Sequence, residues 1–418
     1  MNKIRNIKGT KDLLPDETFI WQELENKIHH FNQRFGYKEI RTPAFEESHL
    51  FERGVGSETD IVNKEMYSWV DQGGNNLTLK PELTAPVTRA YIQHELGKSS
   101  PINKLYYIDS LFRRERPQKG RQRQFHQFGV EVFGSAFPEQ DAEIIIMAYT
   151  FLQSLGLNDI TLELNTIGSK SIRSNYITVL QDLLSKYKHD FSDTDQKRLD
   201  KNPLRLFDSK DPKCKQIMEE NAPTIYEYIS DDDKKHFDAV CNILNNANIE
   251  YMHDEKLVRG LDYYTRTTFE IKSQALGSQD ALCGGGRYDE LVEQLGGKST
   301  PAVGFAAGIE RIIISMAKQI EQHQILDVFM VLIGEDALQI GMNMAIDIRK
   351  ACDLSVITET LRRSMRSQMR EANRLNAKYC LIIGEDEINT NTVMVKNMID
   401  GQQSSIDISK ITDYFNQK

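Results

Sequence analysis

The stretch from Phe112 to Phe133, FRRERPQKGRQRQFHQFGVEVF, contains two extended arms joined by a polar loop. This pattern predicts an antiparallel hairpin. Side chains alternate between the two faces of a strand, so Gln127 and Glu131 lie on the same face and flank Gly129. A glycine within a strand often marks a point where another backbone or a ligand approaches closely. We therefore expect this face to form the floor of a small polar pocket.

The loop of this hairpin is strongly basic. Against one acid, Glu115, it carries six basic residues: Arg113, Arg114, Arg116, Lys119, Arg121 and Arg123. Phosphate is the natural partner of such a cluster. The alternative is a solvated hairpin tip without a ligand. The position of Gly129 between the polar residues Gln127 and Glu131 makes this alternative less favoured.

The composition is that of a globular protein with two or three domains. Hydrophobic residues make up 39% and charged residues 27% of the 418 residues, and the formal net charge is −9. No run approaches the roughly 18 apolar residues of a membrane span, and the polar start lacks a signal-peptide core. We expect a cytoplasmic protein with no membrane partner, in which local basic patches make any nucleic-acid contact.

The cysteines suggest neither a disulfide framework nor a zinc site. They are odd in number, far apart and without a CxxC pair: Cys214, Cys241, Cys283, Cys352 and Cys380. We therefore expect no protein-bound metal.

The first half of the chain alternates helical and extended patterns. Apolar residues at helical spacing predict a helix over 19–35, and residues 37–42 suggest a short strand. A second amphipathic helix is expected over 141–155. The segment 168–252 is polar, mostly helical in pattern and rich in charge runs, so we interpret it as a helical insertion.

Three further stretches offer polar groups. Glu82 and Thr84 can share one side of an extended segment and present a carboxylate and a hydroxyl to an ammonium group, although a helix capped by Thr84 is the favoured alternative. Arg259 precedes two tyrosines in the β-rich stretch 257–271 and either lines a pocket with them or pairs with a surface acid. Arg311 falls in the first turn of a helix, where the positive end of the dipole disfavours a cation. A bound anion or pairing with an acid such as the adjacent glutamate would resolve that conflict.

Two nucleotide-binding motifs fail on spacing. Gly297-Lys298-Ser299 resembles the end of a phosphate-binding loop, but Val292 stands where that loop requires glycine. A dinucleotide fingerprint beginning at Gly284 would need a third glycine at Asp289. Both of these nucleotide folds are disfavoured.

The C-terminal part follows a β-α-β-α-β order. Strands are expected over 328–333, 354–358 and 379–383, with helices between them, which predicts a separate small α/β domain with a partly parallel sheet. The second helix, expected over 361–376, is rich in arginine. It is a candidate RNA-facing surface, with a solvated face as the alternative.

These stretches together resemble the histidyl-tRNA synthetase family of class II aminoacyl-tRNA synthetases, and the likeness covers nearly the whole chain. The family's motifs stand in its order: GTKD from Gly9, the segment around Pro43, the hairpin, LVRGLDYYTRTTFE from Leu257, GGGRYD from Gly284 and GFAAGIER from Gly304.

The resemblance implies an α/β (α+β) fold in three parts. A class II catalytic domain with an antiparallel sheet of six or seven strands flanked by helices would occupy residues 1–167 and 253–322. The helical insertion would occupy 168–252, and an α/β anticodon-binding domain 327–418. A homodimer with the Pro43 segment at its interface is also implied.

The resemblance implies the activity as well. Histidine would react with ATP, accompanied by Mg²⁺, to give histidyl-adenylate and pyrophosphate, and tRNA(His) would then take the histidyl group. Arg113, Arg259 and Arg311 would be catalytic: Arg113 on the α-phosphate, Arg311 on the γ-phosphate, and Arg259 on the α-phosphate and the histidine carboxylate, supplying the positive charge that a metal ion supplies in other class II enzymes. Phe125 and Arg311 would sandwich adenine, and Glu115 would also contact ATP.

The remaining implied roles concern histidine and tRNA. The α-amino group would be bound by Glu82, Thr84 and Gln127, and the imidazole by Glu131 and Tyr264. Further residues implied around histidine are Arg113, Arg259, Tyr263 and Tyr288. Residues implied to contact tRNA, with Gln118 and its neighbours facing the extra 5′ nucleotide, are Arg116, Gln118, Arg123, Arg362 and Arg366.

Two other functions are compatible with parts of this pattern. A non-catalytic paralogue, the regulatory subunit that senses histidine for ATP-phosphoribosyltransferase, would bind histidine without charging tRNA. That class tends to lack the arginines at positions corresponding to Arg259 and Arg311, and to lack the C-terminal domain, whereas this chain has both. An RNA-binding module without ATP chemistry is the second alternative.

Overall fold

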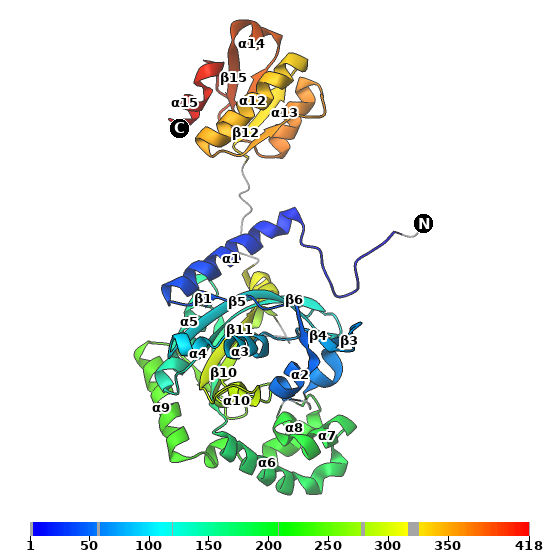
Figure 1. Cartoon of the computed structure of the whole chain (residues 1–418), viewed down its shortest axis with the longest axis vertical. Coiled ribbons are helices and arrows are strands. Elements are labelled where there is room, and N and C mark those ends of the chain that lie inside the picture. Colours follow the sequence, from blue (N-terminus) through cyan, green and yellow to red (C-terminus); the bar gives the residue numbers. More distant parts are fainter. Residues whose placement is uncertain are drawn as a thin grey trace. The chain divides into compact units, whose positions relative to one another are not determined.

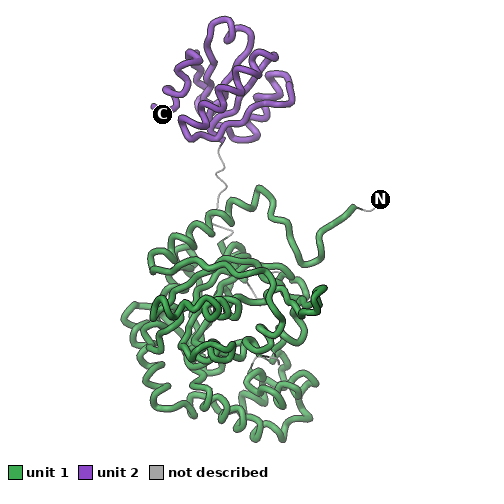
Figure 2. Tube along the Cα trace, in the orientation of Figure 1, with its two compact units in different colours: residues 1–320 green, residues 321–418 purple. Residues whose placement is uncertain are grey.

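A computed structural model of the chain describes residues 3–56, 59–118, 120–207, 209–276, 281–316 and 326–417. The chain divides into two compact units, residues 1–320 and 321–418 (Figure 2). The linker expected near residues 318–324 lies outside the described residues. We describe each unit by itself.

Unit 1 is built on one large sheet (Figure 1). Over the described ranges this sheet has eight strands in the order β1-β5-β6-β11-β10-β9-β7-β8. Their bounds are β1 Lys38–Glu39, β5 Asn103–Phe112, β6 Gln124–Phe133, β7 Ile160–Thr166, β8 Met252–His253, β9 Thr265–Ser273, β10 Ala281–Arg287 and β11 Ala302–Gly308. Each of the six inner strands, from β5 through β6, β11, β10 and β9 to β7, is antiparallel to the next. The two-residue edge strands β1 and β8 run parallel to their neighbours. The expected antiparallel sheet is confirmed.

The predicted hairpin forms the second and third strands of this sheet. β5 and β6 pair over their full length, from Asn103 opposite Phe133 to Phe112 opposite Gln124. Three apolar side chains of β6 lie in the main hydrophobic core: Phe128, Val130 and Val132. Their neighbours in sequence face the other side of the sheet, as the alternation predicted.

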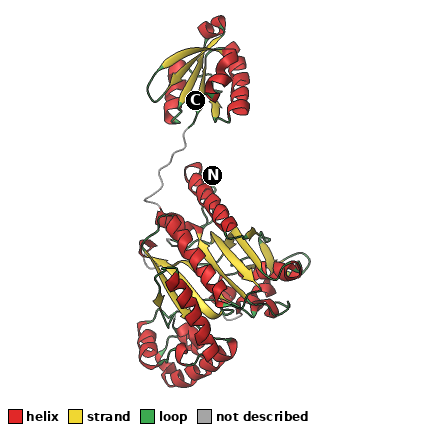
Figure 3. Ribbon diagram, turned by 90° about the vertical axis from the view of Figure 1, so that its left-hand side faces the viewer, coloured by secondary structure: helices red, strands yellow, loops and turns green. Residues whose placement is uncertain are grey.

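Within the described residues, four helices cover the apolar face of the sheet. They are α1 Pro15–Arg34, α5 Pro138–Ser154, α9 Asp231–Asn246 and α11 Ile309–Met316. α1 begins earlier than the predicted 19–35, because a proline at its first position suits a helix start. The strand expected over 37–42 is only two residues long. Figure 3 shows helices lying along the strands of this sheet.

The other face of the sheet carries smaller elements. They include three short helices, α3 Thr84–Gln93, α4 Leu96–Ser99 and α10 Leu291–Gln294. They also include a three-stranded sheet with the order β2 Phe45–Glu47, β4 Asn76–Leu79 and β3 Tyr67–Val70. The remaining elements are α2 Ser48–Phe51 and the π-helical turns η1 Glu52–Gly56 and η2 Ile61–Glu65. The 3₁₀ turn η6 Gln274–Leu276 follows β9.

The segment 168–252 is helical, as expected. It contains α6 Lys170–Leu184, η3 Ser185–Asp190, α7 Asp193–Lys201, η4 Pro203–Leu206, α8 Pro212–Asn221 and η5 Ile225–Glu227 before α9. The buried side chains of α9, Phe237, Val240 and Leu244, belong to the main core. The last helix of the expected insertion therefore packs against the large sheet of unit 1.

A buried ion network ties this layer to the sheet. Asp141 of α5 accepts hydrogen bonds from Arg287 and Thr267 and contacts His236 Nε2 at 2.7 Å. Arg287 is fully buried, so its positive charge is stabilised by the carboxylate of Asp141 rather than by water.

Unit 2 confirms the predicted β-α-β-α-β order. The elements are β12 Val328–Leu332, α12 Glu335–Cys352, β13 Val356–Thr358, α13 Met365–Arg374, β14 Tyr379–Ile383, α14 Glu385–Thr390, β15 Thr392–Asn397, β16 Gln403–Asp407, η7 Ile408–Lys410 and α15 Ile411–Asn416. β12 runs parallel to β13 and β14, and the last two strands add in antiparallel fashion, so the sheet is partly parallel. α13 is shorter than the expected 361–376. No helix in the described part of the chain is long and apolar enough to cross a membrane.

Candidate active site

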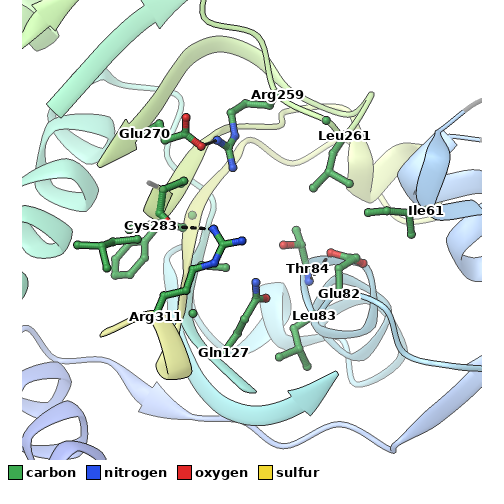
Figure 4. Close-up of a pocket in the computed structure, with 18 of the residues that line it drawn as sticks. Ile61, Glu82, Leu83, Thr84, Gln127, Arg259, Leu261, Glu270, Cys283 and Arg311 are labelled. Carbon is green, nitrogen blue, oxygen red and sulfur yellow. Dashed lines mark hydrogen bonds and ion pairs between the residues drawn. The ribbon is translucent and has the colours of Figure 1, made fainter. Parts of the chain in front are cut away.

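A cavity of about 660 Å³ opens on the polar face of the hairpin (Figure 4). Figure 4 shows Arg259 and Arg311 reaching toward the same space as Gln127, Thr84 and Glu82. The cavity brings together every residue expected to bind histidine or ATP: Glu82, Thr84, Arg113, Glu115, Phe125, Gln127, Glu131, Arg259, Tyr263, Tyr264, Tyr288 and Arg311. Residues more than 200 positions apart in the chain therefore meet at one site.

Glu131 lies at the floor of the cavity and is held by hydroxyl groups. Thr84 Oγ1 donates to its Oε1 at 2.7 Å, Tyr107 donates to the same oxygen at 3.1 Å, and Tyr288 donates to Oε2. The side chain is almost completely buried. Burial raises the pKa of Glu131 from 4.5 to about 8, and these hydrogen bonds oppose the rise.

Glu82 caps the helix that begins beside it. Its carboxylate accepts the backbone N–H groups of Thr84 at 2.8 Å and Ala85 at 2.9 Å, at the start of α3. The expectation that Thr84 caps this helix is therefore wrong, because the Thr84 hydroxyl donates to Glu131 instead. Burial raises the pKa of Glu82 to about 7 despite the two N–H groups, so the cavity contains two carboxyl groups that ionise near neutral pH.

Strand glycines make room for these groups. A Cβ at Gly304 would lie 2.0 Å from Glu131 Oε2, and one at Gly284 would lie 2.2 Å from the guanidinium of Arg259. A Cβ at Gly129 would lie 2.4 Å from both the Tyr107 hydroxyl and the Phe305 carbonyl oxygen. The close approach predicted at Gly129 is thus an approach of protein groups that shape the floor.

Arg259 enters the cavity from the loop before β9. Its Nη1 donates to Glu270 Oε1 at 2.5 Å, and Glu270 is on β9. Burial acts to lower the pKa of Arg259, and the charge of Glu270 outweighs it and raises that pKa. Arg259 is therefore a fixed cation, paired with a cavity carboxylate rather than with a surface acid.

Arg113 begins the loop of the hairpin. Its Nε donates to the carbonyl of Pro81 at 2.8 Å, and its guanidinium lies 5.2 Å from the ring centre of Phe125. Glu115 Oε2 pairs with Arg121 at 2.9 Å, so the acid of this loop faces the cavity among cations.

Arg311 also faces the cavity. Its guanidinium donates to the carbonyls of Gly120 at 3.1 Å and Ala281 at 2.7 Å. The alternative that Arg311 pairs with the adjacent Glu310 is wrong. The Glu310 carboxylate instead accepts the backbone N–H of His126 and contacts the ring Nδ1 of that histidine at 2.8 Å. Burial and the charge of Arg121 lower the pKa of Arg311. An anion between these arginines would relieve their repulsion.

The cavity lining also contains residues that the sequence did not predict, among them Tyr107, Glu270 and Cys283. Tyr107 is opposite Gly129 in the β5–β6 register, and opposite residues share a face, so the hairpin alignment contained the information. Nothing in the local pattern distinguished Glu270 from an ordinary strand carboxylate, since its partner Arg259 lies in an irregular loop.

The residues expected to contact tRNA lie outside the cavity lining. Arg116 and Gln118 are exposed in the hairpin loop, and the backbone N–H of Arg123 donates to the carbonyl of Gly9 at 2.7 Å. Lys119 lies outside the described residues. In unit 2, Arg362 precedes α13 and pairs with Glu335 at 3.1 Å, whereas Arg366 is exposed on α13.

Comparison with known proteins agrees with this geometry. The family model for histidyl-tRNA synthetase matches residues 9–312, and that for the anticodon-binding domain matches residues 327–418. The chain belongs to the histidyl-tRNA synthetase family. The histidine–tRNA ligase of Caldanaerobacter subterraneus is 43% identical over 97% of each chain. The crystal structure of apo Staphylococcus aureus histidyl-tRNA synthetase matches with a TM-score of 0.84 and 34% identity, covering 99% of this chain and 100% of that one.

Family membership makes the chain an ATP-dependent ligase that charges tRNA(His) with histidine. The fold alone is shared more widely. A Bacillus halodurans protein described as an ATP phosphoribosyltransferase regulatory subunit/histidyl-tRNA synthetase matches at 20% identity with a TM-score of 0.65, over 91% of this chain and 98% of that one. Full-length relatives that are ligases favour the catalytic function over the regulatory alternative.

The raised pKa values predict how stability depends on pH. Glu131 and Glu82 keep their protons in the folded protein up to about pH 8 and 7, whereas the unfolded chain loses them near 4.5. This contribution to stability is complete below about pH 4.5 and is lost as the pH rises through these folded-state values. We therefore expect the thermal unfolding midpoint of unit 1 without ligands to decrease when the pH is raised from 5 to 8. The decrease should be smaller in Glu131→Gln.

Glu139→Gln is the matched control, because Glu139 is exposed on α5. Its midpoint should follow the pH dependence of the parent protein. If Glu131→Gln and the parent lose the same number of degrees from pH 5 to pH 8, the buried carboxyl does not titrate as described.

Proposed function

We propose that the cavity of unit 1 activates histidine and that its arginines and carboxyls divide the work as follows. An oxygen of the histidine carboxylate attacks the α-phosphorus of ATP, the bond to the bridging oxygen breaks, and pyrophosphate leaves with that electron pair. The 3′-hydroxyl of the terminal ribose of tRNA(His) then attacks the histidyl carbonyl and AMP leaves.

The observation that carries this assignment is the convergence of Arg113, Arg259 and Arg311 from three separate segments on one cavity. Negative charge spreads over the phosphate oxygens during phosphoryl transfer, and fixed cations stabilise it without reorganising. Arg113 and Arg259 would hold the α-phosphate, and Arg311 the γ-phosphate. Phe125 and Arg311 would enclose adenine, after the guanidinium of Arg113 leaves the Phe125 ring for phosphate.

The floor of the cavity suits histidine. Glu82, with its pKa near 7, would ionise beside the α-ammonium group, and Thr84 and Gln127 would complete the contact. A neutral imidazole has one donor and one acceptor, which Glu131 and the Tyr264 hydroxyl would satisfy. Tyr263 and Tyr288, whose ring centres lie 5.5 Å apart, would pack around them. Analogues without these polar groups would leave buried carboxyls unpaired.

The tRNA contacts follow the family resemblance, and their exposure supports them for Arg116, Gln118, Arg362 and Arg366. In the hairpin loop, exposed Arg116 and Gln118 would meet the 5′ end of tRNA(His), with Arg123 behind them. In unit 2, Arg362 and Arg366 would face the anticodon stem through phosphate contacts. Arg362 would exchange Glu335 for phosphate at little cost, because exposed ion pairs contribute little.

Several wider features of the resemblance belong to the same proposal. Mg²⁺ would arrive on the phosphates of ATP as part of that substrate, because Mg²⁺ is usually held by substrate phosphates and one or two carboxylates. The protein would act as a cytoplasmic homodimer with the Pro43 segment at its interface. Its domains would be residues 1–167 with 253–322, the insertion 168–252, and 327–418.

Arg259→Ala tests the proposed chemistry. The variant should lose at least about 100-fold in histidine-dependent ATP–pyrophosphate exchange, the size of effect seen when one electrostatic donor is removed from a transition state. Lys298→Ala removes an exposed cation outside the cavity and should exchange at the parental rate. Exchange by Arg259→Ala within a few-fold of the parent, with an unchanged thermal midpoint, would refute the role of Arg259.

Removal of residues 327–418 tests the division of labour. Unit 1 is a compact body with its own core, so it should retain ATP–pyrophosphate exchange within about tenfold. Charging of tRNA(His) with labelled histidine should fall much further, because the anticodon contacts are gone. Equal losses in the two assays would show that unit 2 is needed for adenylate formation itself.

A further inference from the structure

The loop 258–264 carries Arg259 and the tyrosines of the cavity but contains no helix or strand. An irregular loop lacks the repeating backbone hydrogen bonds that fix a strand, so other elements must hold it. One contact comes from η1, where the carbonyl of Val55 accepts from the N–H of Asp262 at 3.2 Å. The others described below come from the helical segment 168–252.

Arg173 of α6 holds the C-terminal half of the loop. Its Nη1 donates to the carbonyl of Asp262 at 2.7 Å and to the carbonyl of Tyr264 at 2.8 Å. A single guanidinium thus bridges two carbonyls on either side of Tyr263. This contact fixes the backbone from which both cavity tyrosines project.

Arg205 and Asn202 hold the N-terminal half. Arg205 Nη2 donates to the carbonyl of Gly260 at 2.8 Å and to Asp262 Oδ1 at 3.4 Å, and Asn202 Nδ2 donates to the same oxygen at 3.0 Å. Gly260 follows Arg259 directly. The Arg205 side chain is only 11% exposed, and its contact with Asp262 is partly buried, whereas Gly260 lies at the surface.

A small cavity of about 20 Å³ separates these residues from Arg259, and Arg173, Asn202, Arg205, Asp262 and Tyr264 also line it. Three buried polar atoms of its lining have no hydrogen-bond partner among the described residues: Asn202 Oδ1, Arg205 Nε and Arg259 Nε. Arg259 therefore lines the same small cavity as the residues of the helical segment that hold its loop.

We propose that Arg173, Asn202 and Arg205 are positioning residues, which hold the loop 258–264 so that Arg259 and Tyr264 face the cavity in the form that accepts histidine. The inference rests on the proposed function of that cavity. None of the three touches substrate, and each acts through the loop. A loop that is competent for only a fraction of the time raises the apparent dissociation constant by the inverse of that fraction. Saturating histidine restores the competent form, so turnover recovers.

Arg205→Ala separates positioning from chemistry in the full-length protein. In ATP–pyrophosphate exchange, the KM for histidine should rise about tenfold while kcat stays within about threefold of the parent. Arg205→Lys keeps the charge and a donor and should recover part of the loss, and Arg173→Ala should repeat the KM effect. Lys188→Ala is the matched control, because its ion pair with Asp200 lies on the surface of the same segment. It should change neither constant.

Hydrogen exchange gives a readout that does not need activity. The backbone amides of residues 258–264 should exchange faster in Arg205→Ala and Arg173→Ala than in Lys188→Ala. An inactive parent protein would refute the proposed function, and the exchange rates would still decide whether the segment holds the loop. The inference is overturned if both arginine variants match Lys188→Ala in exchange rate and in KM, or if kcat falls while KM is unchanged.

Discussion

The site depends on a carboxyl group buried at the floor of the cavity. Glu131 is on β6, the second strand of the hairpin, and its hydroxyl partners come from the start of α3, from β5 and from the segment after β10. An unsatisfied buried carboxyl is costly, so these elements must meet for the fold to be stable. The same hydrogen bonds that satisfy the group place it where an imidazole can reach it.

Around this floor, glycines of the sheet leave room for large side chains, and other segments contribute the positively charged arginines. Gly284 and Gly304 leave room on β10 and β11 for Arg259 and for Glu131. The cations reach the cavity from less regular segments: the hairpin loop, the loop before β9 and the first turn of α11. In the proposed function, histidine recognition would depend on Glu131 on a strand, whereas Arg259 would depend on contacts that hold its loop, such as those made by Arg205.

The sequence was most informative where a regular pattern reports the environment. Alternation along β6 assigned both faces of the hairpin, and the helical period located α1, α5 and the helices of unit 2. It favoured Thr84 as the cap of α3, where Glu82 accepts the backbone N–H groups instead, because the local pattern does not reveal the buried partner Glu131 that takes the Thr84 hydroxyl. The pairs Arg259–Glu270 and Arg205–Gly260 join distant segments through irregular backbone, which no local period reveals.

The most direct test of the account is ATP–pyrophosphate exchange with each of the twenty amino acids in the absence of tRNA. A floor built from Glu82, Glu131 and Tyr264 requires an ammonium group and a ring with one donor and one acceptor, so exchange should occur with histidine alone. Exchange with another amino acid at a comparable rate would contradict the assigned recognition. No exchange with any of them would contradict the activating chemistry of the three arginines.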